Sequence, residues 1–280
     1  MRRPLIALLS AAALTAGLLV TAPAVQADPA PGYYLALGDS LAAGYQPAHG
    51  SVPAGDTDEG YVNDLYATLP GAADGSLQLN NLGCSGETTT SMISGGVCDY
   101  AEGSQLDAAV AFINAHPGQV KYLTLDIGAN DVDKCAPGGS IDAACVLQGV
   151  ETIAKNLNTI LAALKKADGG TPVSIGMNYY DPFLQYWTTG LQGELVATAS
   201  VALLVAINTV EQTLYGLYGF KVADVFSAYQ TANFSSKTLF GTPVNVQTIC
   251  ALTYMCSVQN IHPNAQGYQV IANAFAAKLG

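Results

Sequence analysis

The stretch Tyr33-Tyr34-Leu35-Ala36-Leu37-Gly38-Asp39-Ser40 decides the fold of this chain. Its first five residues form an apolar run typical of a buried strand, and the glycine that follows ends the strand in a turn. Comparable runs recur along the chain and alternate with segments of helical spacing. We expect strands over residues 33–38, 77–82, 120–127, 173–177 and 221–225, and helices over 61–69, 105–115, 141–167, 193–215 and 265–279. This alternation predicts an α/β fold in which helices cover both faces of a parallel sheet.

Three small or polar residues directly follow three of these strands. Ser40, Gly83 and Asn130 come just after the strands that end near residues 38, 82 and 127. In a parallel sheet the carboxyl ends of the strands meet at one edge, and ligands bind beyond that edge. We therefore expect these three residues to lie together at the carboxyl edge of the sheet.

The N-terminus has the pattern of an export signal. A basic start is followed by an apolar run over residues 5–20 and then by Val25-Gln26-Ala27, where a signal peptidase would cut. A retained membrane anchor is the alternative, but the run is short for a span and polar residues interrupt it. We expect residues 1–27 to be a signal peptide and residues 28–280 to form one secreted, extracellular domain. This domain is expected to be a monomer with no stable membrane anchor.

The chain is acidic, with a formal net charge of -11 over 280 residues. Loss of Arg2 and Arg3 with the signal takes this charge to -13. An acidic surface repels phosphate backbones, so we expect no nucleic acid partner. The charge favours solubility, but it does not identify a substrate.

All six cysteines lie in the exported part of the chain, and an even number there indicates a disulfide framework. The count alone leaves many pairings open. Proximity in the sequence favours three short loops, closed by Cys84 with Cys98, Cys135 with Cys145, and Cys250 with Cys256. A metal site is the weaker alternative because the chain contains no Cys-x-x-Cys motif.

Ser40 is a candidate nucleophile, and it needs a base because an unassisted hydroxyl attacks poorly. Of the three histidines, His116 precedes a proline at a predicted helix end, and His49 lies in a loop rich in glycine and proline. The third, in Asn260-Ile261-His262-Pro263-Asn264, is anchored by the last predicted helix and is the candidate base. Both the serine and this histidine have a plain alternative role as helix-capping residues.

Two further blocks lie between this serine and histidine: Asn81-Leu82-Gly83-Cys84-Ser85-Gly86-Glu87-Thr88 and Ile127-Gly128-Ala129-Asn130-Asp131. Glycine and asparagine can donate N–H groups to a developing oxyanion, so the four blocks contain the groups that acyl transfer requires. In this order the blocks resemble those of the SGNH hydrolases, also called the GDSL lipase/esterase family. The resemblance extends over nearly the whole chain after the signal.

This resemblance implies a flavodoxin-like, three-layer α/β/α fold with a central parallel five-stranded sheet. It also implies a serine esterase or lipase that uses no metal and no cofactor. Ser40 would be the nucleophile and His262, followed by the family's proline, would be the base. The oxyanion would be bound by the backbone N–H groups of Ser40 and Gly83 and by the side chain of Asn130.

Two acidic residues next to these positions are interpreted as supporting residues. Asp39 and Asp131 would be framework residues that hold the loops around the site. Secreted family members of actinobacterial type carry three loop disulfides, which supports the pairing given above.

In one respect the chain departs from the family. Most members have an aspartate three residues before the histidine, and here that position is Gln259, which carries no charge. We therefore expect a Ser-His dyad, or a triad with a non-standard third member, in which a backbone carbonyl or an amide oxygen accepts a hydrogen bond from the imidazole. Without a carboxylate partner, the pKa of the histidine should lie at or below about 6.5.

The expected substrate is a small-molecule, lipid or sugar ester, and the sequence fixes neither its acyl length nor its alcohol. Aromatic residues over 179–187 either line a pocket or pack in the core. Two other functions remain open. One is a non-catalytic ligand-binding protein on the same scaffold, and the other is a metal-dependent phosphoesterase, for which three histidines are few.

Overall fold

The computed structural model describes residues 31–51, 53–236 and 241–280, so the predicted signal peptide lies outside the described residues. The strands are β1 (Gly32–Gly38), β2 (Leu77–Asn81), β3 (Val120–Asp126), β4 (Val173–Met177) and β5 (Lys221–Ala223). They form one parallel sheet in the order β2-β1-β3-β4-β5. The predicted five-stranded parallel sheet is confirmed, and its strand order is that of the flavodoxin-like folds.

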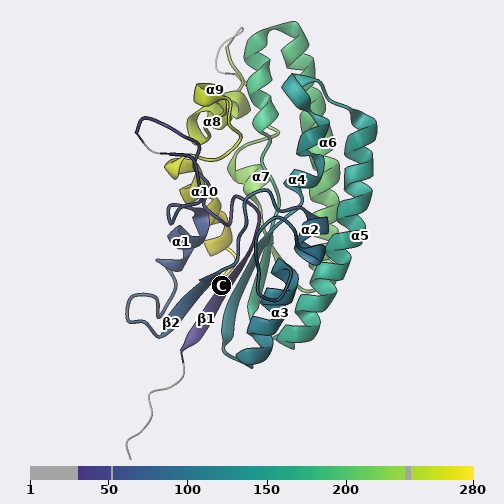
Figure 1. The fold of residues 1–280 in the computed structure, drawn as a ribbon. Coiled ribbons are helices and arrows are strands. Elements are labelled where there is room, and N and C mark those ends of the chain that lie inside the picture. The colour runs from purple at the N-terminus through teal and green to yellow at the C-terminus, as the bar shows by residue number, and fades with distance from the viewer. Residues whose placement is uncertain (1–30, 52, 237–240) are drawn as a thin grey trace, which may run out of the picture.

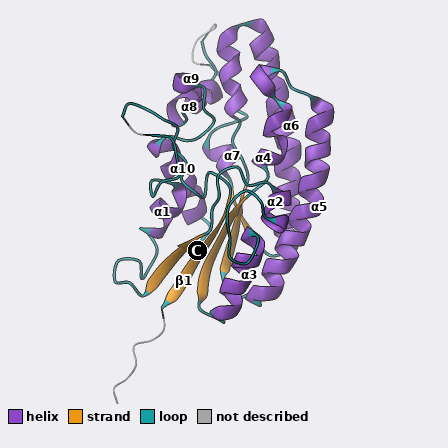
Figure 2. Cartoon of the chain, in the orientation of Figure 1, coloured by secondary structure: helices purple, strands orange, loops and turns teal. Residues whose placement is uncertain are grey.

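Helices cover both faces of the sheet (Figure 1; Figure 2). On one face lie α1 (Tyr61–Tyr66) and α10 (Ala265–Ala276). The other face carries α3 (Gln105–Ala115), α5 (Ala143–Asp168) and α6 (Leu191–Leu217). The predicted three-layer α/β/α architecture is therefore confirmed.

The ends of the predicted helices follow local capping. The Asp142 side chain accepts a hydrogen bond from the backbone N–H of Cys145 at 3.1 Å, so α5 begins at Ala143 and not at residue 141. A second predicted boundary also differs: α1 ends at Tyr66, whereas the prediction extended to residue 69. After Tyr66 the chain tightens: the N–H of Thr68 donates to the carbonyl oxygen of Leu65 at 2.9 Å, and the N–H of Leu69 donates to that of Tyr66 at 3.0 Å.

Short helical elements fill several connections, and the sequence pattern did not predict them. They are α2 (Thr89–Ser94), α4 (Ala129–Val132), α7 (Val225–Ala228), α8 (Val244–Leu252), α9 (Met255–Val258) and the 3-10 turns η1 (Asp133–Cys135), η2 (Pro137–Gly139) and η3 (Pro182–Thr189). Most are too short for a hydrophobic period to show in the sequence.

The side chains of β1 alternate between two hydrophobic cores. Tyr34 and Ala36 belong to the core under α1 and α10, where the rings of Tyr61 and Phe275 stack at 4.7 Å. The intervening leucines of β1 belong to the core under α3 and α5. Burial on both faces holds β1, and thus the turn that follows it, in a fixed position.

By length and composition alone, α6 is apolar enough to cross a membrane, with a mean hydropathy of 1.7 over its most apolar window. In this structure it packs against η3 and α5, and residues such as Val201, Ile207 and Tyr215 are buried. The core helices of soluble domains pass the same composition test, so the composition does not make α6 a membrane span.

Candidate active site

Ser40 follows β1 in a tight turn at the carboxyl edge of the sheet. Gly38 has a φ of +150°, and a Cβ atom there would lie 2.4 Å from the carbonyl oxygen of Asp126, so only glycine fits. The Asp39 carboxylate accepts a hydrogen bond from the backbone N–H of Leu41 at 2.9 Å and closes the turn. The nucleophile candidate is therefore placed by a strand with two buried faces and by a glycine that cannot be replaced.

His262 lies beside Ser40, although 222 positions separate them in the chain. The Nε2 atom of the imidazole is 2.7 Å from the Oγ atom of Ser40. The ring also packs against Tyr45, with ring centroids 4.4 Å apart. The structure thus brings the predicted nucleophile and base within hydrogen-bond reach.

The other ring nitrogen of His262 has an amide partner. Oδ1 of Asn260 lies 2.7 Å from Nδ1 and 3.1 Å from the backbone nitrogen of His262. A backbone N–H can only donate, so the amide atom that faces it is the oxygen. This oxygen can only accept, so Nδ1 carries the ring proton and Nε2 accepts from the hydroxyl of Ser40. That tautomer is the one a general base requires.

Gln259, at the position of the family's usual aspartate, does not fill this role. Its backbone is left-handed, with a φ of +55°, and the residue is exposed. The turn at Gln259 brings the next residue, Asn260, to the imidazole. The sequence left a backbone carbonyl and an amide oxygen open as partners, and the structure has the amide.

Contacts from other parts of the chain hold the segment that carries His262. The hydroxyl of Tyr180 donates to the carbonyl oxygen of Ile261 at 2.7 Å. The backbone N–H of Tyr254 donates to the histidine carbonyl at 2.9 Å. A disulfide between Cys250 and Cys256 closes the connection in which this tyrosine lies. These contacts fix the ring relative to β4 and to the turn between α8 and α9.

Burial lowers the pKa of His262 to about 4. The hydrogen bonds of the ring go to a hydroxyl and an amide, neither of which favours the imidazolium as a carboxylate does. The imidazole is therefore neutral at pH 7, in the form that accepts a proton from Ser40. The direction of the shift agrees with the expectation from the sequence.

Asn130 lies in the first turn of α4, directly after β3, and lines the same pocket as Ser40 and His262. Its Nδ2 atom donates to the carbonyl oxygen of Glu87 at 2.8 Å, which fixes the amide. An amide nitrogen carries two N–H groups, so the second can serve a ligand.

The N–H of Gly83, which the resemblance assigns to the oxyanion hole, has a hydrogen-bond partner in its own segment of the chain. The N–H of Gly83 donates to Oδ1 of Asn81 at 2.9 Å, and Gly83 is not among the described residues that line the pocket. A Cβ atom at residue 83 would lie 2.6 Å from the backbone nitrogen of Ala43. Glycine here permits close contact with the segment after the nucleophile, and an oxyanion role would require its N–H to leave Asn81.

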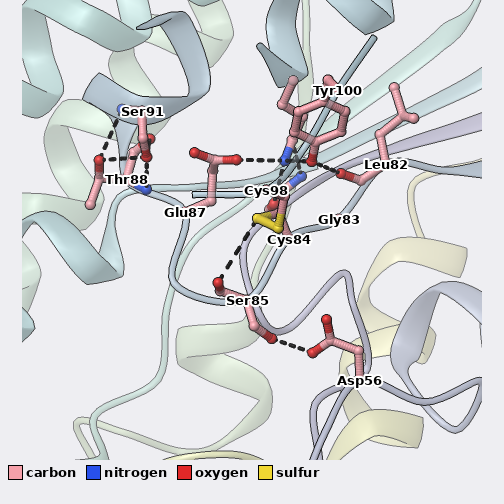
Figure 3. Close-up of a disulfide and its surroundings, with 12 residues drawn as sticks. Asp56, Leu82, Gly83, Cys84, Ser85, Glu87, Thr88, Ser91, Cys98 and Tyr100 are labelled. Atoms are coloured by element: carbon pink, nitrogen blue, oxygen red, sulfur yellow. Dashed lines mark hydrogen bonds between the residues drawn. A yellow bond between two sulfur atoms is a disulfide. The ribbon is translucent and has the colours of Figure 1, made fainter. Parts of the chain in front are cut away.

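A disulfide and a hydrogen bond hold the segment that carries Gly83 (Figure 3). Cys84 is bonded to Cys98, and the hydroxyl of Tyr100 donates to the carbonyl oxygen of Leu82 at 2.7 Å. These contacts fix the backbone on either side of the glycine, so its approach to the nucleophile loop does not depend on the local sequence alone.

The structure contains the three disulfides that sequence proximity favours: Cys84–Cys98, Cys135–Cys145 and Cys250–Cys256. The first fixes the Gly83 segment and the third fixes the His262 segment. The second joins η1 to the first turn of α5, and both of these elements contribute to the pocket wall. Each disulfide therefore holds a segment that borders the site.

Asp39 and Asp131 accept hydrogen bonds from neighbouring segments. The Asp39 carboxylate accepts from the hydroxyl of Tyr179 at 2.9 Å. The Asp131 carboxylate accepts from the backbone N–H and the hydroxyl of Thr89, at 2.8 Å and 2.7 Å. Burial raises the pKa of both carboxyl groups. Their contacts tie loops together, as the framework role requires.

Two buried residues beneath the nucleophile were not predicted from the sequence. Oε1 of Gln105 accepts from the N–H of Gly38 at 2.8 Å, and its Nε2 donates to the carbonyl oxygen of the same residue at 3.0 Å. Asp126 accepts from the backbone N–H of Asp39 at 3.2 Å and from the hydroxyl of Tyr61. A single glutamine at a helix start and an aspartate at a strand end carry no spacing signal that relates them to the nucleophile turn.

A pocket with a volume of about 110 Å³ opens beside Ser40. Its walls are largely apolar and come from α4, α5, α6 and the turns between them, with residues such as Val132, Ile141, Val146, Leu203, Leu204 and Ile207. Of the aromatic stretch after β4, Tyr179, Tyr180 and Phe183 line this pocket. Trp187 instead packs against Phe234, at 5.5 Å between ring centroids. The stretch therefore serves both as pocket wall and as packing.

Neither of the other two histidines lines this pocket. His49 packs against Tyr254, at 5.2 Å between ring centroids, and His116 packs against Tyr33 at 4.4 Å. Among the residues that the structure describes, no three His, Cys, Asp or Glu side chains group so that they could hold a metal ion.

Comparison with known proteins adds to this geometry. The sequence profile of the GDSL-like lipase/acylhydrolase family matches residues 36–270. A search of curated protein sequences finds no match. Among solved structures, the extracellular lipase of Streptomyces rimosus is similar, with 18% identity, a TM-score of 0.57, and coverage of 88% of this chain and 99% of the lipase.

Two further solved structures share the fold. A putative GDSL-like lipase from Parabacteroides merdae has 18% identity and a TM-score of 0.56, with coverage of 89% of this chain and 95% of that one. Phospholipase A1 from Streptomyces albidoflavus has 18% identity and a TM-score of 0.53, with coverage of 89% and 100%. With the profile match spanning most of the sequence and the fold shared, this chain belongs to the GDSL-like lipase/acylhydrolase family.

Proposed function

We propose that the protein is a secreted serine esterase or lipase, active as a monomer, that hydrolyses carboxylic esters without a metal or cofactor. One observation carries this proposal. A continuous hydrogen-bond chain runs from Oδ1 of Asn260 through both nitrogens of His262 to Oγ of Ser40, and each link is 2.7 Å long. The disulfides and the likeness to an extracellular Streptomyces lipase support secretion.

In the acylation step, Nε2 of His262 takes the hydroxyl proton while Oγ of Ser40 attacks the ester carbonyl carbon. The carbonyl π electrons move to oxygen, and the N–H of Ser40 and the second N–H of Asn130 stabilise the resulting oxyanion. The N–H of Gly83 joins them once it leaves Asn81. The imidazolium then protonates the departing alkoxide, and the acyl group remains on the serine.

Deacylation repeats these roles with water. His262 removes a proton from a water molecule, whose oxygen attacks the acyl carbonyl, and then returns the proton to Oγ of Ser40 as the carboxylic acid leaves. Throughout both steps Asn260 holds the proton of the ring on Nδ1 and fixes the plane of the imidazole.

Two alternatives fit less well. A non-catalytic binding protein has no need for an imidazole in the tautomer and position of a general base, which His262 has. A metal-dependent phosphoesterase needs a ligand cluster, and no group of three candidate ligands occurs among residues 31–51, 53–236 and 241–280.

Reaction with a fluorophosphonate tests the proposal directly. Wild type should be labelled on Ser40, as located by peptide mass spectrometry, and should hydrolyse p-nitrophenyl butyrate at a rate that chelators do not change. Folded Ser40→Ala and His262→Ala proteins should lose nearly all hydrolysis. Wild-type turnover in folded Ser40→Ala protein would exclude the mechanism. N-terminal sequencing of the exported protein should begin at Asp28, and its mass in solution should be that of one chain.

A further inference from the structure

The pocket beside Ser40 contains a buried acid, Asp181, to which neither the proposed reaction nor the framework around Ser40 assigns a role. Asp181 follows β4, is 2% exposed, and lines the pocket together with Ser200. Its Oδ1 atom accepts from the backbone N–H of Phe183 at 2.8 Å and thereby starts η3. Its Oδ2 atom is buried and has no hydrogen-bond partner among the described residues.

No neighbouring group neutralises this carboxyl. The described residues that line the pocket include no lysine and no arginine. The hydroxyl of Ser200 on α6 is close enough to lower the pKa of Asp181, but it donates its hydrogen bond to the carbonyl oxygen of Ala197 at 3.0 Å. Burying a carboxyl oxygen without a partner destabilises a fold, so this atom is suited to a ligand that supplies the missing hydrogen bond.

The chemistry of the ligand group follows from the protonation of Asp181. Burial raises the pKa of Asp181 to about 7, so both forms of the carboxyl are present near neutral pH. The protonated form donates and the ionised form accepts. A hydroxyl can do both, whereas an ether or carbonyl oxygen pairs only with the protonated form and an ammonium group only with the ionised form.

The pocket begins at the place where the ester carbonyl would react. It is lined by Asn130, the proposed oxyanion donor, and it continues from there along Val132, Val146 and Ile207. The carbonyl on which the oxyanion forms carries both the acyl chain and the alcohol. Of the two, only the acyl chain stays attached to Ser40 after the first step, so it is the part of the ester that needs a pocket through both steps.

We infer that this pocket accepts an acyl chain that carries a hydroxyl group, and that Oδ2 of Asp181 binds this hydroxyl. The inference rests on the proposed esterase activity and names its substrate class, the esters of hydroxyalkanoic acids. Asp181 contacts the chain and not the reacting atoms, so it determines specificity and takes no part in the bond-making steps.

Specificity constants for paired esters with one leaving group test the inference. The pairs compare p-nitrophenyl hexanoate with p-nitrophenyl 3-hydroxyhexanoate, 6-hydroxyhexanoate and 6-aminohexanoate. Wild type should prefer at least one hydroxylated ester over hexanoate by about tenfold in kcat/KM, the size of one hydrogen bond. The amino ester should gain less than the hydroxylated esters at pH 7, because its ammonium group pairs only with the ionised form of Asp181.

Two variants of Asp181 assign the preference to this residue. Asp181→Val should bring the ratio of hydroxylated to plain ester to about one. Asp181→Asn keeps the oxygen that caps Phe183 and places an NH2 group where Oδ2 was. This group donates and cannot accept, so the ratio should fall several-fold at pH 8, where the wild-type carboxylate accepts from the hydroxyl. The other ionisable residues that line the pocket are Asp39, Asp133, Tyr179, Tyr180 and His262. These residues are unchanged in both Asp181 variants, so they do not account for a difference from wild type.

Asp133→Val is the matched control, because Asp133 lines the same pocket but is exposed. It should leave the ratio unchanged. A wild-type ratio near one overturns the inference, and so does a preference for the amino ester over the hydroxylated esters. Equal losses on both esters in Asp181→Val, or an unchanged ratio in Asp181→Asn, also overturn it. If wild type hydrolyses no ester at all, the proposed function itself fails, whereas hydrolysis without preference removes only this inference.

Discussion

The Oδ1 atom of Asn260 lies 2.7 Å from Nδ1 of His262, so a neutral amide orients the imidazole of this site. A carboxylate at this position would orient the ring and would also favour the imidazolium, which raises the pKa of the base. An amide supplies the first effect without the second. The imidazole therefore stays neutral far below pH 7. Asn260 orients the ring but does not stabilise the imidazolium.

Replacing Asn260 by aspartate should raise the pKa of His262, because the new carboxylate would lie at hydrogen-bond distance from Nδ1. An opposite charge this close shifts a pKa by about one to three units, so the acidic limb of kcat/KM should move to higher pH by at least about one unit. Gln259→Asp is the matched control: it adds the same charge one residue earlier, on an exposed left-handed residue. Profiles of kcat/KM against pH measure both, and an equal shift in the two variants would contradict the assignment of Asn260.

The difference between these two neighbours shows where prediction from the sequence ends. The sheet could be predicted because its strands are rich in apolar β-forming residues and alternate with helical segments. Ser40 and Asn130 could be brought to one edge because each follows a strand. The partner of His262 could not be identified, because a left-handed backbone at Gln259 moves the contact by one residue. A non-glycine residue in that conformation has no signal in the sequence.

The same limit applies to Gly83. The sequence predicts that Gly83 follows a strand, but it does not predict where the N–H of Gly83 points. That direction depends on the side chain of Asn81, which accepts from Gly83 and donates to the carbonyl oxygen of Ala42 at 2.8 Å. Contacts between neighbouring loops of this kind are set by the packed fold and not by local pattern.

Asn130→Ala should slow ester hydrolysis by removing one oxyanion donor. The cost for one such donor is about 2.7–4 kcal/mol in the barrier, or roughly a 10²- to 10³-fold loss in kcat. KM should change little, because the interaction strengthens as charge develops on the oxygen. Steady-state kinetics with p-nitrophenyl butyrate measure both constants. A rise in KM with kcat intact would mean that Asn130 binds the ground state and does not stabilise the transition state.

Gly83→Ala should lower both stability and activity, because the added Cβ would lie 2.6 Å from the backbone nitrogen of Ala43 and force the nucleophile segment away. Overpacking of this kind costs about 1–3 kcal/mol. Gly216→Ala is the control: this glycine lies within α6, and a Cβ there meets nothing within 4 Å. It should keep full activity and gain up to about 1 kcal/mol of stability from the higher helix propensity of alanine. Urea titrations and kinetics on both variants test this, and a fully active Gly83→Ala enzyme would show that the close contact is dispensable.

The low pKa of His262 sets the pH dependence of the wild-type enzyme. The reaction needs the neutral imidazole, so kcat/KM should rise with pH through an acidic limb near pH 4 and reach its plateau well below pH 7. Stability should respond in a defined direction. Between the unfolded pKa of about 6.5 and the folded value, the unfolded chain binds a proton that the folded chain does not, so the contribution of His262 to stability falls as the pH falls through this window. His262→Gln removes this proton uptake, so the difference in the free energy of unfolding between wild type and variant should change with pH only below about 6.5. An activity limb above pH 7 would instead require a carboxylate partner for the imidazole, and the assignment of Asn260 as its neutral partner would then be wrong.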